Sequence, residues 1–597
     1  MCGIFGIFFG SKVKANRDKA AKIGRIASEL LKHRGPDGVG MTVNAKFLFL
    51  NRRLSIQDIT DQGNQPFHDQ DRKIHVIQNG EIYNFGELKK KLQQKGHYFK
   101  SNCDTEVILK MYLEYGLDMV SQFNGMFAIA IYDEGKQQGY LIRDRLGVKP
   151  LFIHRDDENN VWFASEIKAL KPFIEKNSLN IGSICKYFYH NYINTNETIY
   201  GKIQQVDAGT ILISQNNQIS IKKYWDIRNI KVETDVSQYD HQKELNNLLN
   251  DSTALRMGCD ASFGAFLSGG IDSGLVTSAM SKISSVPIHT FCLSFDEEFY
   301  DEGKYSEMFS AQFKTHHRTV KSDGFDFSKW ARVLSHTDQP HGDASFIPMY
   351  QISKYASKYV KVILTGDGGD EIFGGYDKYV NVFKCIIDNK LTDDILDHYI
   401  DSCCLINDSM AKRVFTNEFY EEFRSMEFHN KTKSDIYSYG KDDMINSILK
   451  YDIENLLKGN NLVKPDRMGM ANSIEIRSPL LDYRITEYAF KISGRAKFYK
   501  NETKSLLKSL LAKQVNPDLV YKRKQMFTVP IGEWMKNVKF WTNFESHLGD
   551  SFESTNIFNV KGVRQMITEH TECKENHTRV LRAILAYCLW YKNYSLN

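Results

Sequence analysis

The chain has 597 residues, of which 42% are hydrophobic and 25% are charged, as in ordinary globular proteins. Its net charge is only +5 and it holds no block of like charges, which argues against a nucleic-acid-binding protein. No apolar run approaches the ~18–20 residues that a membrane-spanning helix needs, and the ten cysteines form no CxxC pair. We therefore predict a cytoplasmic protein with reduced thiols that binds neither nucleic acid nor membrane.

The first ~210 residues predict strands in hairpins together with two helices. Turn residues such as Asn79-Gly80 and Asp133-Glu134-Gly135 separate the apolar runs. The expected strands are 2–9, 47–50, 74–78, 126–132 and 139–143, and the expected helices are 19–31 and 105–115.

From about residue 240 the pattern changes to alternating helices and strands, which predicts a parallel sheet in an α/β domain. Residues 215–240 are polar and could link the two parts, and residues 395–450 and 560–594 are mostly helical in pattern. The expected strands here are 263–267, 288–295 and 360–365, and the expected helices are 242–257, 275–283 and 304–313.

Cys2 is the most informative residue of the first part. If Met1 is removed, Cys2 carries a thiol nucleophile and a free α-amino group on the same residue. An α-amine has an unperturbed pKa of about 7.7–8.0, so it can act as the base that activates the thiol. This end of the chain is therefore suited to cleave an amide.

Four further motifs follow Cys2 in a fixed order, and each has a plain alternative when taken alone. Asn79-Gly80 could be only a hairpin turn, Arg53 a surface charge and Cys103 a filler of the core. The motifs are His33-Arg34-Gly35-Pro36-Asp37, Asn51-Arg52-Arg53-Leu54-Ser55-Ile56, Asn79-Gly80-Glu81-Ile82-Tyr83-Asn84 and Ser101-Asn102-Cys103-Asp104-Thr105-Glu106.

Their order after Cys2-Gly3-Ile4 resembles the class II glutamine amidotransferases over about residues 2–170. The resemblance implies that Arg53 and Asp104 bind the α-carboxylate and α-ammonium of glutamine, with Glu81 and the backbone of Leu54, Ser55 and Ile56 alongside. It also implies that the Asn79 side chain and the Gly80 N–H stabilise the oxyanion formed when Cys2 attacks, at roughly 3–4 kcal/mol per donor.

A glycine-rich loop, Ser268-Gly269-Gly270-Ile271-Asp272-Ser273, follows an apolar run in the second part. It lacks the Gly-Lys-Ser/Thr ending of a Walker loop and resembles the pyrophosphate loop of N-type ATP pyrophosphatases. In that resemblance, backbone N–H groups at a helix N-terminus hold pyrophosphate, and Asp272 binds Mg²⁺.

A second acidic segment, residues 364–376, also follows an apolar run, and a Gly/Asp-rich surface loop is its alternative interpretation. As a ligand site it would place Asp370 beside Asp272 on a shared Mg²⁺. A third segment, residues 464–482, is expected to add cations to this site together with Lys504 and Lys522-Arg523-Lys524.

Taken together, these motifs resemble the glutamine-hydrolysing asparagine synthetases over essentially the whole chain. The resemblance implies an αββα N-terminal-nucleophile hydrolase sandwich at 1–215, and at 240–597 a parallel-sheet α/β ATP pyrophosphatase domain with a helical C-terminal part. It implies a β-aspartyl-AMP intermediate, an internal ammonia tunnel and a possible homodimer. ATP-contact positions of the family fall on Leu267, Leu293, Thr365 and Gly366, and catalytic ones on Asp367 and Lys504.

Two departures keep alternatives open. Asp367 stands where the best-characterised family members have Glu, and the segment 341–349 lacks the Arg that they place near the aspartate site. One alternative is a related amidotransferase that amidates another carboxylate, such as a uronic acid in a surface polysaccharide. Another is a non-catalytic glutamine-binding protein, against which Cys2, Asp272, Asp370 and Lys504 argue. The ring-closing relatives of the family often lack this cysteine, so the presence of Cys2 argues against that activity.

Overall fold

The computed structural model describes most of the chain. The described residues are 2–10, 16–69, 71, 73–174, 178–194, 196–233, 238–297, 300–322, 324, 327–521 and 529–595. The predicted cations Lys522-Arg523-Lys524 lie outside them. Among the described residues, no helix combines the length and apolar character that a membrane crossing requires.

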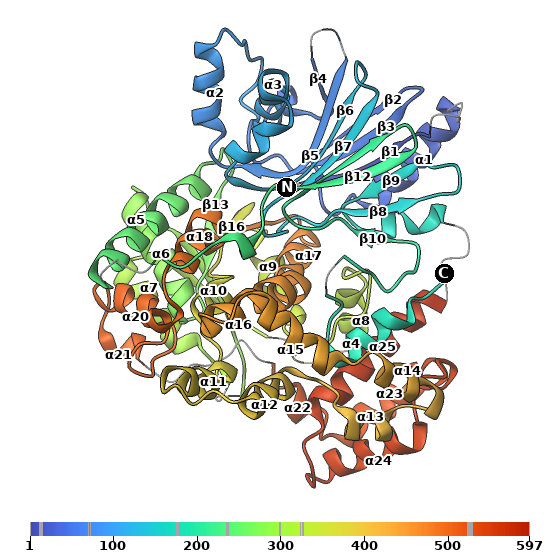
Figure 1. The fold of residues 1–597 in the computed structure, drawn as a ribbon, viewed down its shortest axis with the longest axis vertical. Helices are drawn as coiled ribbons and strands as arrows, with labels where there is room; N and C mark the ends of the chain where they lie inside the picture. Colours follow the sequence, from blue (N-terminus) through green and yellow to red (C-terminus); the bar gives the residue numbers. More distant parts are fainter. Residues whose placement is uncertain are drawn as a thin grey trace.

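The N-terminal part consists of two six-stranded antiparallel sheets packed face to face (Figure 1). The first sheet has the order β10-β8-β9-β1-β3-β2 and the second β12-β11-β7-β6-β5-β4. The strands are β1 (Cys2–Phe8), β2 (Gly38–Val43), β3 (Phe47–Arg53), β4 (Phe67–His68), β5 (Ile74–Ile82), β6 (Gly125–Asp133), β7 (Gln138–Arg143), β8 (Phe152–Arg155), β9 (Val161–Ala164), β10 (Gln204–Gln205), β11 (Thr210–Gln215) and β12 (Gln218–Lys223).

Strand β1 has a period of two that explains why it lies in the interior. Ile4 and Phe8 pack in the cluster between the two sheets, whereas Phe5 and Ile7 pack on the other face, where helix α1 (Arg17–Leu30) lies. On the second sheet, helices α2 (Phe85–Gln94) and α3 (Asp104–Tyr115) cover the outer face. These layers confirm the predicted αββα sandwich.

The second part is built on a five-stranded parallel sheet in the order β15-β14-β13-β16-β17. The chain runs outward from the central β13 on one side and then returns to build β16 and β17 on the other. This arrangement creates a topological switch point between β13 and β16, where ligands bind in open parallel sheets. The strands are β13 (Phe263–Phe266), β14 (His289–Ser294), β15 (His316–Lys321), β16 (Val362–Leu364) and β17 (Glu475–Arg477).

Helices surround this sheet and form a C-terminal lobe at the opposite end of the molecule from α2 and β4 (Figure 1). The parallel sheet and the helical C-terminal part confirm the predicted fold class. The main helices are α5 (Gln238–Met257), α6 (Ile271–Ile283), α7 (Gly303–Phe313), α8 (Phe327–Leu334), α9 (Phe346–Ala356), α10 (Gly369–Phe373), α11 (Lys378–Ile387), α12 (Asp393–Cys403), α13 (Asp408–Val414), α14 (Asn417–Ser425), α15 (Phe428–Ser438), α16 (Met444–Asp452), α17 (Val463–Met470), α18 (Tyr483–Lys491), α20 (Ser505–Ala512), α23 (Val538–Ser554), α24 (Val560–Thr571) and α25 (Thr578–Ser595).

Two features bear on the division between the parts. The second sheet continues beyond residue 215, because β12 pairs with β11. Helix α4 (Ile181–His190) packs in the same hydrophobic cluster as α25, and the Tyr187 hydroxyl donates a hydrogen bond to the Ala583 carbonyl at 2.8 Å. The division into domains 1–215 and 240–597 stays a prediction.

Candidate active sites

Cys2 lies at the start of the buried strand β1, at the junction between the sandwich and the rest of the molecule (Figure 1). It pairs in register with Arg53 on β3 and is only 6% exposed. Burial raises the pKa of its thiol, while hydrogen bonds from the Leu54 backbone and the Asn51 side chain oppose that rise. Asn51 opens the sequence motif that contains Arg53, but the motif alone gave it no role beside Cys2.

Asn79 and Gly80 lie beside Cys2 on the neighbouring sheet, in strand β5. The Asn79 Oδ1 accepts a hydrogen bond from the Cys2 nitrogen at 3.2 Å, and its buried Nδ2 has no partner among the described residues. Gly80 has a φ of +151°, and a Cβ there would lie 2.1 Å from the Met126 carbonyl oxygen. Only glycine fits this position, and the unpartnered amide is a donor that is free to meet an oxyanion.

Arg53 and Asp104 are both buried and are held by their surroundings. The Arg53 guanidinium donates to the carbonyls of Gln57, Asp58 and Thr60, so the loop that follows β3 folds around it. Asp104 accepts from Gln78 Nε2 at 2.7 Å and from the Ile82 N–H at 2.9 Å, while burial raises its pKa.

Glu81 and the segment Leu54–Ile56 face the second part of the chain. Glu81 Oε2 lies 3.1 Å from Arg477 Nη2, and no described residue hydrogen-bonds its Oε1. Leu54 and Ile56 pack in a cluster with residues of β13, α6 and β16, and the Ser55 N–H donates to Asp37. Glu81 therefore forms an ion pair across the interface between the two parts of the chain.

The predicted phosphate loop follows β13 at the switch point and opens helix α6. Its N-cap residue is Gly270, and no described side chain caps the helix, so its first N–H groups can bind an anion. The hydroxyls of Ser268 and Ser273 lie 3.3 Å apart, and Gly269 has a φ of +75°. Leu267 is fully buried, and Leu293 lies on the adjacent β14.

The acidic loop after β16 packs directly on Asp272. A Cβ at Gly366 would lie 2.5 Å from the Asp272 Cβ, and one at Gly369 would lie 2.6 Å from the Asp272 Cγ. The Thr365 hydroxyl donates to Asp367 Oδ2 at 2.6 Å, and burial raises the pKa of Asp367. Two loops that are distant in sequence thus form one site at the carboxyl ends of β13 and β16.

Lys504 bridges the two predicted metal ligands. Its Nζ hydrogen-bonds Asp272 Oδ2 and lies 2.6 Å from Asp370 Oδ1. Burial lowers the pKa of Lys504, but the two carboxylates outweigh burial and raise it overall. Because both carboxylates reach one cation, and because hard oxygen ligands suit Mg²⁺, these residues fit a shared magnesium ion.

Comparison with known proteins agrees with this geometry. Residues 244–592 match the family model described as asparagine synthase, and residues 1–225 match that of a glutamine amidotransferase domain. The chain belongs to the asparagine synthase family. This membership confirms the resemblance that the motifs predicted.

Three relatives of the family cover different shares of the chain. The glutamine-hydrolyzing asparagine synthetase 1 of Bacillus subtilis (strain 168) is 28% identical over 99% of this chain and 96% of its own length. Glutamine-hydrolyzing asparagine synthetase 2 of the same organism is 30% identical over 88% of this chain and 72% of its own length. Glutamine-hydrolyzing asparagine synthetase B of Escherichia coli (strain K12) is 28% identical over 63% of this chain and 65% of its own length.

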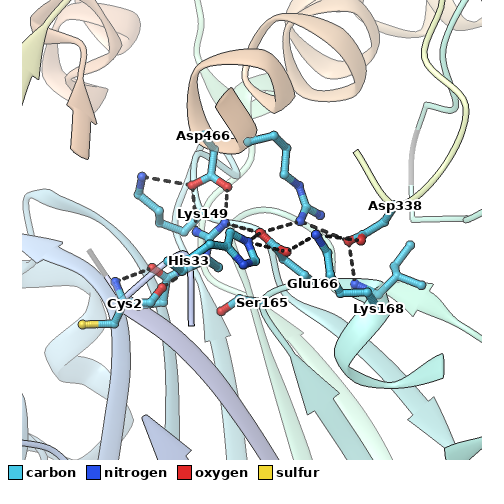
Figure 2. A network of polar contacts seen from close by, with 12 residues as sticks. Cys2, His33, Lys149, Ser165, Glu166, Lys168, Asp338 and Asp466 are labelled. Carbon is cyan, nitrogen blue, oxygen red and sulfur yellow. Dashed lines mark hydrogen bonds and ion pairs between the residues drawn. The ribbon is translucent and has the colours of Figure 1, made fainter. Parts of the chain in front are cut away.

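In this member of the asparagine synthase family, a buried charge network joins the two parts just behind Cys2 (Figure 2). Arg34 is fully buried, and its Nε donates to the Cys2 carbonyl at 3.2 Å. Its Nη1 lies 2.8 Å from Glu166 and 2.9 Å from Asp466 of α17. Arg467, also on α17, contacts Glu166 at 3.0 Å and Asp338 at 3.1 Å.

This network corrects one expectation about the segment 464–482. Its arginines were expected to add positive charge to the ATP site. Arg467 instead pairs with Glu166, and Arg477 with Glu81, at the interface. Lys464 is the cation of the segment that acts on the acidic loop, because its charge lowers the pKa of Asp367 and opposes the rise that burial causes.

Proposed function

We propose that the chain makes asparagine from aspartate, with glutamine as nitrogen donor and ATP as energy source. The observation that carries this proposal is the pair of candidate sites in one chain: a buried Cys2 beside an unpartnered amide donor, and two convergent carboxylates at the switch point of a parallel sheet.

In the first site, the Cys2 sulfur attacks the side-chain amide of glutamine. The Asn79 Nδ2 and the Gly80 N–H stabilise the oxyanion, ammonia leaves, and water releases glutamate from the thioester. Arg53 and Asp104 are proposed to hold the substrate head group, with Glu81 and the Leu54–Ile56 backbone beside it.

In the second site, the acceptor carboxylate attacks the α-phosphorus of ATP, and ammonia then displaces AMP. The first N–H groups of α6, with Ser268, Gly269, Gly270 and Ser273, are proposed to hold the departing pyrophosphate. Leu267, Leu293, Thr365 and Gly366 are proposed to contact adenosine. Asp272 and Asp370 would hold Mg²⁺, which neutralises phosphate charge when bound.

Asp367 and Lys504 are proposed to act on the acyl intermediate. A raised pKa suits a carboxylate that accepts a proton from attacking ammonia, and burial raises the pKa of Asp367. Lys504 stays charged because its pKa is raised, so it can stabilise negative charge on the intermediate.

A cavity at the interface supports transfer of ammonia between the sites. It is lined by Gly125 and Met126, which pair with Ile82 and Glu81 on β5, and by Ser478. The Ser478 hydroxyl donates to the Asp367 carbonyl at 2.6 Å. Residues that line the cavity therefore contact the strand of the glutamine site on one side and the acidic loop on the other. A homodimer is proposed from the family resemblance alone, and a cytoplasmic location from the composition and the cysteine pattern.

The decisive experiment measures pyrophosphate release from ATP and Mg²⁺ with aspartate, first with glutamine and then with ammonia. Aspartate-stimulated release and asparagine formation with both donors are expected. Glutamine hydrolysis without aspartate-dependent release would contradict the proposal. It would favour the second candidate, amidation of another carboxylate such as a uronic acid, which the absence of Arg from 341–349 supports.

A further inference from the structure

Buried polar atoms without partners gather around the loop 341–345, on the segment that lacks the expected arginine. His341 is 3% exposed, and among the described residues neither ring nitrogen has a hydrogen bond of normal geometry, although the Gly459 backbone is near. Asn460 Oδ1 and Arg582 Nε are also buried and have no partner in the part of the chain that the structure describes. Because buried polar atoms nearly always have hydrogen-bond partners, such a concentration marks a place for a ligand.

The same place holds three charged groups. Lys464 Nζ donates to Ser345 Oγ at 3.0 Å and lies 4.0 Å from Asp343 Oδ2, beyond a tight ion pair. Asn460 Nδ2 donates to the same Asp343 oxygen at 3.4 Å. Burial raises the pKa of Asp343, but Lys464 and Arg582 outweigh burial and lower it overall. The group therefore offers one carboxylate and two cations.

His341 contributes a neutral ring to this group. Burial lowers its pKa to about 4, with Asp343 opposing and Lys464 and Arg582 assisting the decrease. At neutral pH the ring is therefore uncharged and can both donate and accept a hydrogen bond.

The cluster adjoins the acidic loop of the second site. Asn460 is followed by Asn461, whose Nδ2 donates to Glu371 and, at 2.8 Å, to the Tyr376 hydroxyl. Both asparagines end a π-helix, Ile453–Asn461, a rare geometry that is frequent at functional sites. The wide turn lets consecutive side chains reach the loop 341–345 and the loop after β16.

We propose that Asp343, Lys464 and Arg582, with His341 and Asn460, bind the amino-acid head group of the acceptor. Lys464 and Arg582 take the α-carboxylate and Asp343 takes the α-ammonium, so the side-chain carboxylate points toward Asp367. The inference rests on the proposed function and names its acceptor class. A uronic acid has no ammonium for Asp343, and its only carboxylate must react.

The test compares aspartate with succinate, which has the same carbon skeleton and both carboxylates but no ammonium. Pyrophosphate release is measured with ammonia as donor in wild type, Asp343→Asn and Lys464→Met. We expect Lys464→Met to raise the KM of both acceptors about 10- to 100-fold, with an unchanged KM for ATP. We expect Asp343→Asn to raise the KM of aspartate but not of succinate, so that discrimination between the two is lost.

Lys354→Met is the matched control, because Lys354 is an exposed lysine at the far end of α9, the helix that follows Ser345. Retained glutamine hydrolysis shows that each variant folds. If Lys464→Met does not fold, Asn460→Ala is measured in its place.

The remaining outcomes show whether the head-group site fails alone or together with the proposed function. If wild type uses aspartate and the variants keep its KM and its discrimination, the head-group site is wrong while the proposed function stands. If wild type releases pyrophosphate with a uronic acid but not with aspartate, both fall.

Discussion

Asn79 uses its two amide atoms differently, since the oxygen is bonded to Cys2 and the nitrogen has no partner. Replacing Asn79 by Ala removes the donor without adding bulk. We expect glutamine-dependent synthesis to fall about 10²- to 10³-fold, as for other lost oxyanion donors, while ammonia-dependent synthesis is unchanged. The check is a pair of steady-state assays that differ only in nitrogen donor.

Asn44→Ala is a suitable control, because Asn44 is a partly exposed asparagine of the same sandwich whose side chain bonds Glu134 and the turn between β2 and β3. A glutamine-dependent rate of Asn79→Ala within threefold of wild type would contradict the oxyanion role of Asn79.

At the scale of elements, the glycine loops decide whether the second site can form. A Cβ at Gly375 would lie 1.9 Å from Asp370 Oδ1 and 2.0 Å from Lys504 Cε. Gly375→Ala therefore has to displace a predicted metal ligand and its lysine together. We expect aspartate-dependent pyrophosphate release to fall at least 100-fold, with glutamine hydrolysis retained.

Gly86→Ala gives the comparison for this variant. Gly86 is in helix α2, where an added Cβ meets nothing within 4 Å, so its alanine variant should keep both activities. Equal pyrophosphate release by the two variants would mean that the acidic loop accommodates the added methyl group without loss of activity.

Apolar patterns predicted the strands that lie deep in the molecule. The runs 126–132 and 263–267 became β6 and β13, because buried strands consist mostly of hydrophobic residues. Edge strands β2 and β12 were not predicted. Strand β12 is largely polar and exposed, and β2 holds two glycines and no buried residue, so both resemble loops. The π-helix was also not predicted, because no simple residue period marks it.

The residues of the candidate sites also divide into those that the sequence predicted and those that it did not. Motif order brought out Cys2, Asn79, Asp272 and Asp370, because each lies in a short local signature. The cluster of Asp343, Lys464 and Arg582 was not predicted as a group, since its members come from a loop, α17 and α25 and meet only after folding. The same reason explains the error about Arg467 and Arg477.

For the whole molecule, α17 is the element that joins the two candidate sites. Lys464 faces the proposed head-group site, whereas Asp466, half a turn later, bonds Arg34 behind Cys2. Through Asp466, α17 contacts Arg34, whose Nε donates to the Cys2 carbonyl. One rigid helix thus contacts both candidate sites.

Asp466→Asn tests how much this junction stabilises the molecule. The variant leaves the fully buried Arg34 with Glu166 as its remaining carboxylate in the network, and breaking a buried pair costs about 3–5 kcal/mol. We expect a lower melting temperature at neutral pH. Asp37→Asn, which breaks the exposed interface pair with Lys361, should cost at most about 1 kcal/mol.

The pH dependence of that loss follows from the sign of the pKa shift. Burial raises the pKa of Asp466, but Arg34 and Lys149 outweigh burial and lower it overall. A carboxylate with a lowered pKa stabilises the fold above its unfolded value of about 3.9, and that stability is lost as the pH falls through the folded value. The difference in melting temperature between wild type and Asp466→Asn should therefore be constant from about pH 5 to 8 and shrink below about pH 4. A difference that persists undiminished into acid would assign the loss to packing rather than to charge.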